Sequence, residues 1–436
     1  MKYIIKAFVF ASFIIVCIAA YLRTTDKPSK DAGHKVVLCI PVYGQSLALG
    51  EEAVRMTDFD SLRINHDGRI MTEFLDYGFG FSDDFIMHQR VKRLINYHNG
   101  SFELSIYSMA EELATRLGKD TLLCIFPGGR GLSSISLIRK GTPVYNKFLY
   151  EIRMAYERAR ARGWDFIVPA ICWMQGESDI VDYTGYDYKQ QLKQFGTDIN
   201  QSVKAITRQT SDIPIVCYQS NVLTRAWRFD ANSYEPVETR VAQGVVELIQ
   251  EEPLFWASGP TYPYDIVNEK LHIDGIGQRH IGALDAIAVL RILRHGDKTY
   301  GLTPSSVAVE GNDITVGFRV AVPPLTVDTT IVSPVAHYGF SVITPAGRDI
   351  LEDVIVGDTT VRLKCSQEPE ACRVRYAVNG EKMKSGRLHG PRGNLRDSQG
   401  EGTRIRIAGK YYPLHNWCYQ FDLAAAPGGE SPAVAR

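Results

Sequence analysis

The chain has 436 residues, of which 45% are hydrophobic and 22% are charged. This composition is typical of a globular protein with a sizeable core, and the length favours two domains. The 49 Lys and Arg residues balance the 49 Asp and Glu residues, and no basic run is long enough to follow a phosphate backbone, which argues against nucleic acid as a partner.

The N-terminal segment has the pattern of an export signal. Lys2 and Lys6 are followed by an uncharged stretch of 16 residues, 7–22. That stretch is shorter than the roughly 20 residues of a membrane-spanning helix, and Ala19 and Ala20 form an imperfect cleavage site. We expect residues 1–33 to be a signal peptide or an N-terminal membrane anchor plus a linker. Either outcome places the protein outside the cytoplasm, in the periplasm, at the cell surface or in the medium.

Residues 34–298 alternate short apolar runs with amphipathic helical patterns. The pattern predicts strands over 36–42, 121–126, 166–174 and 213–219, and helices over 103–117, 145–162, 188–209, 236–251 and 282–294. Near-continuous apolar strands separated by helices indicate a parallel sheet covered on both faces. The predicted fold class is α/β, a three-layer α/β/α domain of the flavodoxin-like kind.

Residues 299–423 change to alternating apolar and polar positions punctuated by Gly, Pro and Asp. Strands are predicted over 307–309, 313–322, 354–356, 360–363, 373–378 and 403–407, with a last one that includes 417–421. This pattern indicates an antiparallel β-rich accessory domain, most simply a sandwich. Residues 424–436, with Pro-Gly-Gly and Ser-Pro, are expected to form a disordered tail.

Eight cysteines in an exported protein raise the question of disulfides. Four of them, Cys39, Cys124, Cys172 and Cys217, lie inside apolar strand-like runs and are expected to be buried free thiols. Cys365 and Cys372 bracket a polar turn instead. They are the best candidates for a disulfide pair.

Polar motifs follow the predicted strands at the edge where α/β sheets place their chemistry. Ser46 lies two residues past Gly44, and a serine in such a glycine-permitted turn can act as a nucleophile. The glycines of the next motif, among them Gly129 and Gly131, can present N–H groups to an oxyanion. An isolated Gly-Gln-Ser is most often an ordinary loop, so the interpretation depends on the whole series.

The third and fourth motifs supply the remaining groups of a nucleophilic site. Gln175 offers an amide N–H and Glu177 a carboxylate that can fix the geometry of its loop. His272, just before the last predicted helix, is the candidate general base, whereas its rival His280 is expected to lie along that helix. A Ser-His site uses a carboxylate to hold the histidine tautomer. The candidates are Glu269, three residues before the histidine, then Asp265 and Asp274.

Taken in order, these motifs resemble those of the SGNH hydrolase superfamily, and within it the sialate O-acetylesterase-like carbohydrate esterases. The Trp-Met-Gln-Gly-Glu-Ser-Asp run over residues 173–179 is the most specific part, and the resemblance covers residues 35–294. It implies a serine carboxylic ester hydrolase that uses no cofactor and no metal. The residue roles that it implies are Ser46 as nucleophile, Gly131 or Gly129 and Gln175 as oxyanion donors, Glu177 as bracing carboxylate and His272 as base.

The sequence departs from this pattern at three positions. Leu47 stands where the branch usually has asparagine, and Leu132 where a second glycine is common. Glu269 replaces the aspartate expected three residues before the histidine. Because glutamate is one methylene longer, its pairing with His272 would need a shifted backbone. The acid therefore stays open among the three candidates, with a Ser-His dyad as a further option.

The expected function is removal of O-acetyl groups from a carbohydrate, a sialate or another acetylated glycan, through an acyl-enzyme. Two alternatives remain open at this point. One is a non-catalytic glycan-binding protein that keeps an esterase scaffold, and the other is a lipolytic SGNH esterase acting on longer acyl chains. The sequence does not indicate which sugar or hydroxyl is used, what the β-rich domain does, or the oligomeric state.

Overall fold

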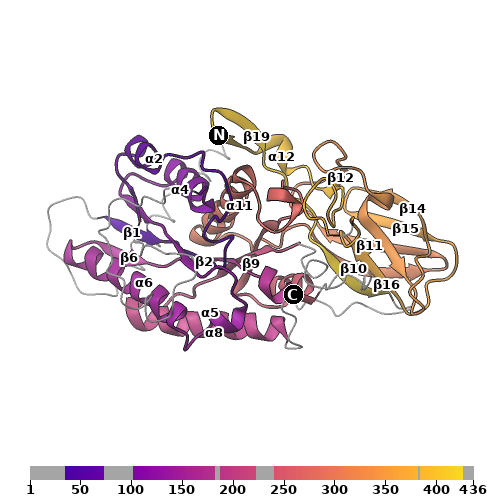
Figure 1. Ribbon diagram of the computed structural model, residues 1–436, viewed down its shortest axis with the longest axis horizontal. Helices are drawn as coiled ribbons and strands as arrows, with labels where there is room; N and C mark the ends of the chain where they lie inside the picture. Colours follow the sequence, from indigo (N-terminus) through magenta and orange to yellow (C-terminus); the bar gives the residue numbers. More distant parts are fainter. Residues whose placement is uncertain (1–34, 73–101, 182–186, 222–239, 382, 426–436) are drawn as a thin grey trace, which may run out of the picture.

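The computed structural model describes residues 35–72, 102–181, 187–221, 240–381 and 383–425. The segment expected to be a signal peptide or anchor, and the tail from residue 426, lie outside these ranges. Within them, no helix has both the length and the apolar character needed to cross a membrane. An α/β part and a β-rich part lie side by side along the long axis of the molecule (Figure 1).

The α/β part is built on a parallel sheet whose strands are interrupted midway. One stretch has the order β3-β4-β1-β6 and the other the order β5-β2-β7-β8-β9. Their bounds are β1 Val36–Cys39, β2 Val42–Gly44, β3 Ile70–Met71, β4 Thr121–Cys124, β5 Pro127–Gly129, β6 Asp165–Ile167, β7 Ile171–Met174, β8 Ile215–Gln219 and β9 Phe255–Pro260.

The two stretches are halves of one sheet, because β1, β4 and β6 continue into β2, β5 and β7. At the first interruption stands Pro41, which has no N–H to donate, yet Ile40 N donates to Cys124 O (2.8 Å) and Val42 N to Phe126 O (3.0 Å). Counting each continued strand once and leaving out the edge strand β3, the order is 2-1-3-4-5. This is the flavodoxin-like order, so the predicted fold class is confirmed.

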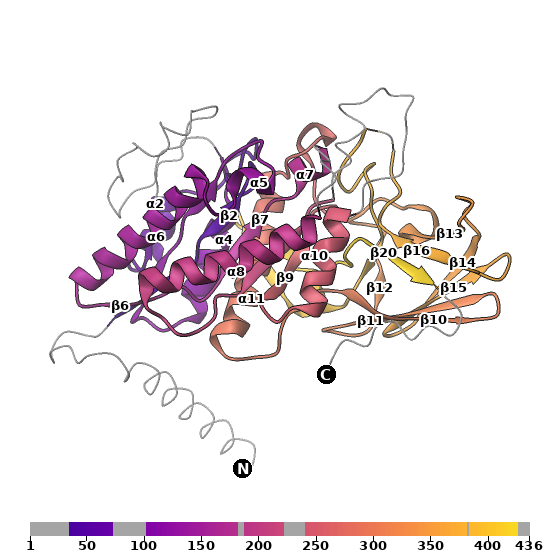
Figure 2. The same ribbon diagram turned by 90° about the horizontal axis from the view of Figure 1, so that it is seen from below.

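Helices cover both faces of this sheet and make three layers. On one face lie α6 (Pro143–Ala161), α8 (Tyr188–Thr207) and α10 (Arg240–Glu251), whose ribbons run across the sheet in Figure 2. On the other lie α2 (Phe59–Asn65), α4 (Ser105–Arg116) and α11 (Gly275–Leu293). Each face has its own apolar core, the first around Phe148 and Phe195 and the second around Tyr107 and Ile281.

Two differences from the sequence prediction have a clear physical reason. Helix α11 begins at Gly275, earlier than the predicted start at residue 282, because Asp274 caps its N-terminus by accepting from Gly277 N at 2.7 Å. Strand β9 was not predicted at all. Its residues 255–260 are buried throughout, but Gly259 and Pro260 interrupt the apolar pattern by which a strand is identified.

The β-rich part consists of two facing antiparallel sheets with small additions. The sheets have the orders β10-β11-β15-β14 and β13-β16-β20, and Val316, Val361, Val342 and Phe421 belong to the core between them. The bounds are β10 Thr303–Glu310, β11 Asp313–Arg319, β12 Thr326–Val327, β13 Phe340–Ile343, β14 Leu351–Val356, β15 Thr360–Cys365, β16 Cys372–Tyr376, β17 Leu395–Arg396, β18 Arg404–Ile407, β19 Lys410–Pro413 and β20 Phe421–Ala425. The described residues also form short helices: α5 Ile135–Ile138, α7 Glu177–Val181, α12 Gln399–Gly402, and the 3-10 turns η2 Val267–Glu269 and η3 Ala336–Gly339.

The cysteines follow the prediction in one respect and contradict it in another. Cys124, Cys172 and Cys217 are buried free thiols, as expected, and Cys39 is buried as well. The predicted Cys365–Cys372 disulfide is wrong, because both thiols are free. Cys365 ends β15 and Cys372 begins β16, and these strands belong to different sheets.

The two parts of the molecule are packed against each other. The β18–β19 hairpin lies on α11, where Ile405, Ile407 and Leu414 share an apolar cluster with Ala283 and Leu284. Polar groups are matched as well: Gln420 N donates to Gln219 Oε1 at 2.8 Å, and Gln219 Nε2 donates to Gln420 O at 2.9 Å. The β-rich part is therefore an integral neighbour of the sheet.

An ion pair within α6 gives a test of how this helix packs on its face of the sheet. The side chains of Lys147 and Glu151 are 1% and 0% exposed, and Lys147 Nζ lies 3.1 Å from Glu151 Oε1. Lys147→Met would leave a buried carboxylate without its cation, so we expect the free energy of unfolding in urea to fall by about 3–5 kcal/mol. The matched control, Lys140→Met, disrupts the exposed Lys140–Asp198 pair and should cost about 1 kcal/mol or less. Equal effects of the two variants would contradict the packing described.

Candidate active site

Close backbone approach brings the serine, glycine and glutamine motifs to one edge of the sheet. Gly44, at the end of β2, pairs with Gly129 of β5 and with Met174 of β7. A Cβ at Gly44 would lie 1.9 Å from Met174 O, and one at Gly129, whose φ is +125°, would lie 1.8 Å from Gly44 O. Only glycine fits at such distances. The turn that follows Gly44 places Ser46 beside the other two motifs.

His272 meets the serine from the loop before α11. Its Nε2 lies 2.8 Å from Ser46 Oγ. Its own backbone is held in a narrow hairpin, in which Val267 N donates to His272 O at 2.7 Å. The rival His280 lies along α11, and its Nδ1 faces the carbonyl oxygen of Ile276 at 2.8 Å. His272 is thus the histidine that the fold brings to Ser46.

The carboxylate on His272 comes from Glu52. Its Oε2 lies 2.7 Å from His272 Nδ1, the nitrogen that faces away from Ser46. Glu52 lies in the turn that follows the serine and has a φ of +64°. That conformation is uncommon for a residue with a side chain. The resulting chain, Ser46–His272–Glu52, has the connectivity of a Ser-His-acid arrangement.

None of the acids considered from the sequence occupies this position. The prediction that Glu269 pairs with His272 is wrong, because its carboxylate accepts from Lys384 and His389 of the β-rich part. Those two contacts lower the pKa of Glu269.

The two other candidate acids are engaged elsewhere as well. Asp265 binds the guanidinium of Arg387 with both oxygens, at 2.7 and 2.9 Å. Asp274 caps α11, and burial raises its pKa to about 6. The fold thus leaves Glu52 as the carboxylate that His272 meets.

Gln175 lies in the site but its amide is already engaged. Its Nε2 donates to Asp179 Oδ2 and lies 3.2 Å from both Gln45 Oε1 and Ser133 O. Its Oε1 accepts from Tyr188 OH at 2.9 Å. These contacts connect the serine motif to the second and third motifs. Gln175 therefore links the motifs, and its contacts do not support the oxyanion role expected from the sequence.

Glu177 and Trp173 are buried behind the site. Glu177 begins α7, is 0% exposed and accepts from Tyr218 OH. Burial raises its pKa, and the hydrogen bond from Tyr218 opposes that rise. Trp173 packs against Tyr43 and Phe195. The contacts of Glu177 are those of a group that braces its loop, and those of Trp173 belong to the core.

Two backbone N–H groups are candidates for binding an oxyanion. Within the described part of the chain, neither Ser46 N–H nor Gly131 N–H donates to a protein acceptor. Glu51 lies next to both residues. Its N–H donates to Ser46 O at 3.0 Å, and its Oε1 would lie 2.5 Å from a Cβ at Gly131. Burial, with repulsion from Glu52 as the smaller cause, raises the pKa of Glu51 to about 7.

Sequence reasoning missed Glu51 and Glu52. The search for the acid concentrated on residues near His272, because the resembling family places it there. A signal was nevertheless present: a Gly-Glu-Glu run over residues 50–52 follows the serine motif directly. Two adjacent carboxylates in a glycine turn beside a nucleophile are candidates for acid–base chemistry whatever the motif order.

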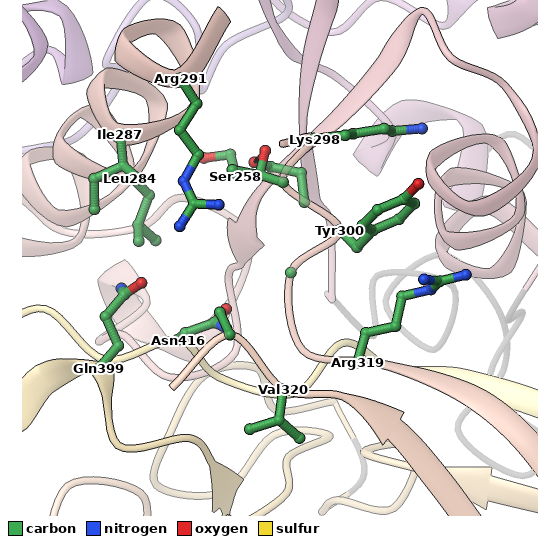
Figure 3. Close-up of a pocket in the computed structure, with 14 residues that line it drawn as sticks. Ser258, Leu284, Ile287, Arg291, Lys298, Tyr300, Arg319, Val320, Gln399 and Asn416 are labelled. Atoms are coloured by element: carbon green, nitrogen blue, oxygen red, sulfur yellow. Dashed lines mark hydrogen bonds between the residues drawn. The ribbon is translucent and has the colours of Figure 1, made fainter. Parts of the chain in front are cut away.

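A cavity between the two parts of the molecule lies apart from the Ser46–His272 site. It is a cavity of about 310 Å³ with Ser258, Leu284, Arg291, Tyr300, Arg319 and Asn416 in its wall (Figure 3). Neither Ser46 nor His272 lines it. Within the described ranges, no group of three or more His, Cys, Asp or Glu side chains is placed to hold a metal ion.

Comparison with known structures supports the fold. A carbohydrate acetylesterase from Xanthomonas citri is 14% identical, with 88% of this chain and 80% of that chain covered and a TM-score of 0.59. NanS is 15% identical over 61% of this chain and 100% of its own, with a TM-score of 0.41. A protein from Arabidopsis thaliana is 16% identical over 58% and 97%, with a TM-score of 0.38.

Sequence comparison matches part of the chain to one family. No curated protein is similar enough to count as a match. The family model described as "Carbohydrate esterase, sialic acid-specific acetylesterase" matches residues 105–289. That range runs from α4 to α11 and includes Gly131, Gln175, Glu177 and His272. Over this range, which is less than half of the chain, the sequence is similar to the sialic acid-specific acetylesterase family of carbohydrate esterases, and the match indicates a carboxylic ester hydrolase.

Proposed function

We propose that the protein is a serine esterase that removes O-acetyl groups from a carbohydrate through an acyl-enzyme. The observation that carries this proposal is the chain from Ser46 Oγ to His272 Nε2 (2.8 Å) and from His272 Nδ1 to Glu52 (2.7 Å). Glu52 holds the tautomer that leaves Nε2 free to accept a proton, and it stabilises the imidazolium that then forms.

In the first half-reaction, Ser46 Oγ attacks the acetyl carbonyl carbon while its proton moves to His272 Nε2. The carbonyl oxygen becomes an oxyanion, and we assign its stabilisation to the N–H groups of Ser46 and Gly131. His272 then gives its proton to the sugar oxygen as the C–O bond breaks. The sugar leaves with a free hydroxyl, and the acetyl group stays on Ser46.

In the second half-reaction, water takes the place of the sugar. His272 accepts one proton from the water as the water oxygen attacks the acyl carbon, and it gives that proton to Ser46 Oγ as the C–O bond to the serine breaks. Acetic acid leaves with the second water proton and then ionises to acetate. Gln175 has a supporting role in this scheme, because the acceptors Asp179, Gln45 and Ser133 already take its N–H groups. Its contacts with Gln45 and Ser133 hold the serine motif beside the glycine motif. Glu177 braces the adjoining loop.

Two observations support a carbohydrate as the substrate. The family that matches residues 105–289 is described as sialic acid-specific, and the Xanthomonas citri protein with this fold is a carbohydrate acetylesterase. The complete Ser46–His272–Glu52 chain argues against the non-catalytic glycan-binding alternative, which has no use for it. We also propose that the enzyme acts outside the cytoplasm, on the basis of the N-terminal sequence pattern.

The role of Ser46 is tested by Ser46→Ala. We expect release of acetate from p-nitrophenyl acetate and from an acetylated glycan mixture to fall by at least about 10⁴-fold, because the nucleophile of the acyl-enzyme is lost. Ser61→Ala, in α2 and away from the site, is the control. Equal rates for the wild type and Ser46→Ala would rule out the proposed mechanism.

The role of Glu52 is tested against that of Glu269. Glu52→Gln keeps the size of the side chain but removes the charge that stabilises the imidazolium, so kcat should fall by about 10²–10⁴-fold. Glu269→Gln should have a smaller effect, because Glu269 does not touch His272 and reaches it only through the backbone of its loop. The reverse ranking of the two variants would restore Glu269 as the acid.

The raised pKa of Glu51, about 7, predicts a pH dependence. Above that pH Glu51 carries a charge beside Gly131, which opposes the oxyanion, so kcat/KM should decline on the alkaline side. Glu51→Gln should remove this decline. An unchanged alkaline limb in the variant would assign it to another group.

The same pKa makes a prediction about stability. Because the folded-state pKa of Glu51 lies above the usual 4.5, folding favours the protonated form. Wild-type stability should therefore fall as the pH rises from about 4.5 to about 7. Urea unfolding measured across this range should show a weaker decline for Glu51→Gln.

A further inference from the structure

One segment of the β-rich part lies directly against the loop that carries His272. We call residues 384–389 the clamp segment and residues 265–274 the histidine loop. The clamp segment comes from between β16 and β17, far from the histidine loop in sequence. It makes both side-chain and backbone contacts with that loop.

Three side chains of the clamp segment bind acids of the histidine loop. Arg387 Nε and Nη2 donate to the two oxygens of Asp265 at 2.7 and 2.9 Å. Lys384 and His389 both contact the carboxylate of Glu269. The bidentate arginine fixes direction as well as distance, so the loop is held at two points, one near each end of the 265–269 stretch.

Backbone contacts fix the same two places. Ser385 N donates to Glu269 O at 2.9 Å, and Arg387 N donates to Tyr264 O at 3.2 Å. Between them stands Gly386, with a φ of +85°. A Cβ at Gly386 would lie 2.7 Å from Ile266 Cγ1 and 3.0 Å from Tyr264 O. The two segments are therefore in contact with no room for a side chain.

The histidine loop has a conformation that needs outside support. Asn268 and Glu269 both have a φ of +54°, a region that residues with side chains seldom adopt in succession. Val267 N donates to His272 O at 2.7 Å and Asp274 N donates to Asp265 O at 2.9 Å. The first bond joins the stretch held by the clamp segment to the backbone of His272, and the second joins it to Asp274, two residues further on.

The clamp segment is itself anchored in the β-rich part. Arg387 Nη1 donates to Ile331 O at 2.9 Å, and Ser333 N donates to Arg387 O at 3.0 Å. Glu381 N donates to His389 O at 2.7 Å. The support given to the histidine loop thus comes from a framework outside the α/β part.

We propose that the clamp segment, through Arg387, Lys384, His389 and Gly386, is a positioning element that sets His272 against Ser46. This inference rests on the proposed function, because it gives the β-rich part a role in that same site. None of the four residues has a contact with Ser46 or His272. They act through the loop and not on the reacting atoms.

The sharpest test is Gly386→Ala, because the added methyl group would separate the two segments. We expect kcat to fall by about 100-fold, the effect of displacing a catalytic group by about 1 Å, with KM unchanged. Gly347→Ala is the matched control: its φ is +80° and no atom lies within 4 Å of its Cβ position. It carries the same backbone strain in the same part of the protein. Equal losses in both variants, or none in Gly386→Ala, would overturn the proposal.

A second test uses the Asp265–Arg387 pair. Arg387→Gln should lower kcat, and Arg387→Lys should restore part of the loss, because it keeps the charge without the bidentate fork. Combining Arg387→Gln with Asp265→Asn should cost no more than the larger single effect, because both act through one contact. Additive losses would contradict a shared positioning role.

A spectroscopic readout separates this inference from the proposed function. In protein labelled with ¹⁵N-histidine, the Nδ1 and Nε2 signals of His272, assigned by their loss in His272→Asn, report its hydrogen bonds to Glu52 and Ser46. We expect these signals to move in Gly386→Ala and not in Gly347→Ala. An inactive wild type would overturn the proposed function while this measurement still decides the positioning role. Unmoved signals in Gly386→Ala would overturn the positioning role even in an active enzyme.

Discussion

The contact on which this site depends is the approach of the β2 backbone to β5 and β7. At Gly44 and Gly129 the neighbouring carbonyl oxygens lie where a Cβ would stand, so neither position tolerates a side chain. This closeness allows the serine motif, the glycine motif and the glutamine motif to share hydrogen bonds across three strands. Gln175 can reach Gln45 and Ser133 because those strands end together.

His272 is the one member of the site that the sheet does not place. It arrives on a loop between β9 and α11, and its backbone conformation includes two consecutive residues with positive φ. Asp274 fixes the end of that loop by capping α11, and the β-rich part fixes its tip. Ser46 is therefore placed by the sheet, whereas the position of His272 depends on the packing of two parts of the chain.

Sequence periodicity was sufficient for the elements that bury a face. The four predicted parallel strands and the long helices α4, α6 and α8 agree with the structure to within a few residues, since their apolar spacing is regular. The strands β9 and β13 and the start of α11 were missed because glycine or a side-chain cap decides them. The serine, the histidine and the motif order could be predicted from residue types that sit at strand ends.

The carboxylate that contacts His272 could not be predicted from the sequence, and the reason is physical. Which carboxylate reaches His272 depends on backbone direction at positive-φ residues and on partners far away in sequence. Glu269 is near His272 along the chain, but Lys384 and His389 hold its carboxylate in the other direction. Glu52 is distant from His272 in sequence, yet its left-handed backbone turns its side chain toward Nδ1. Both the β-rich part, which binds the Glu269 carboxylate, and the turn after Ser46, which brings Glu52 to His272, therefore decide which acid meets the histidine.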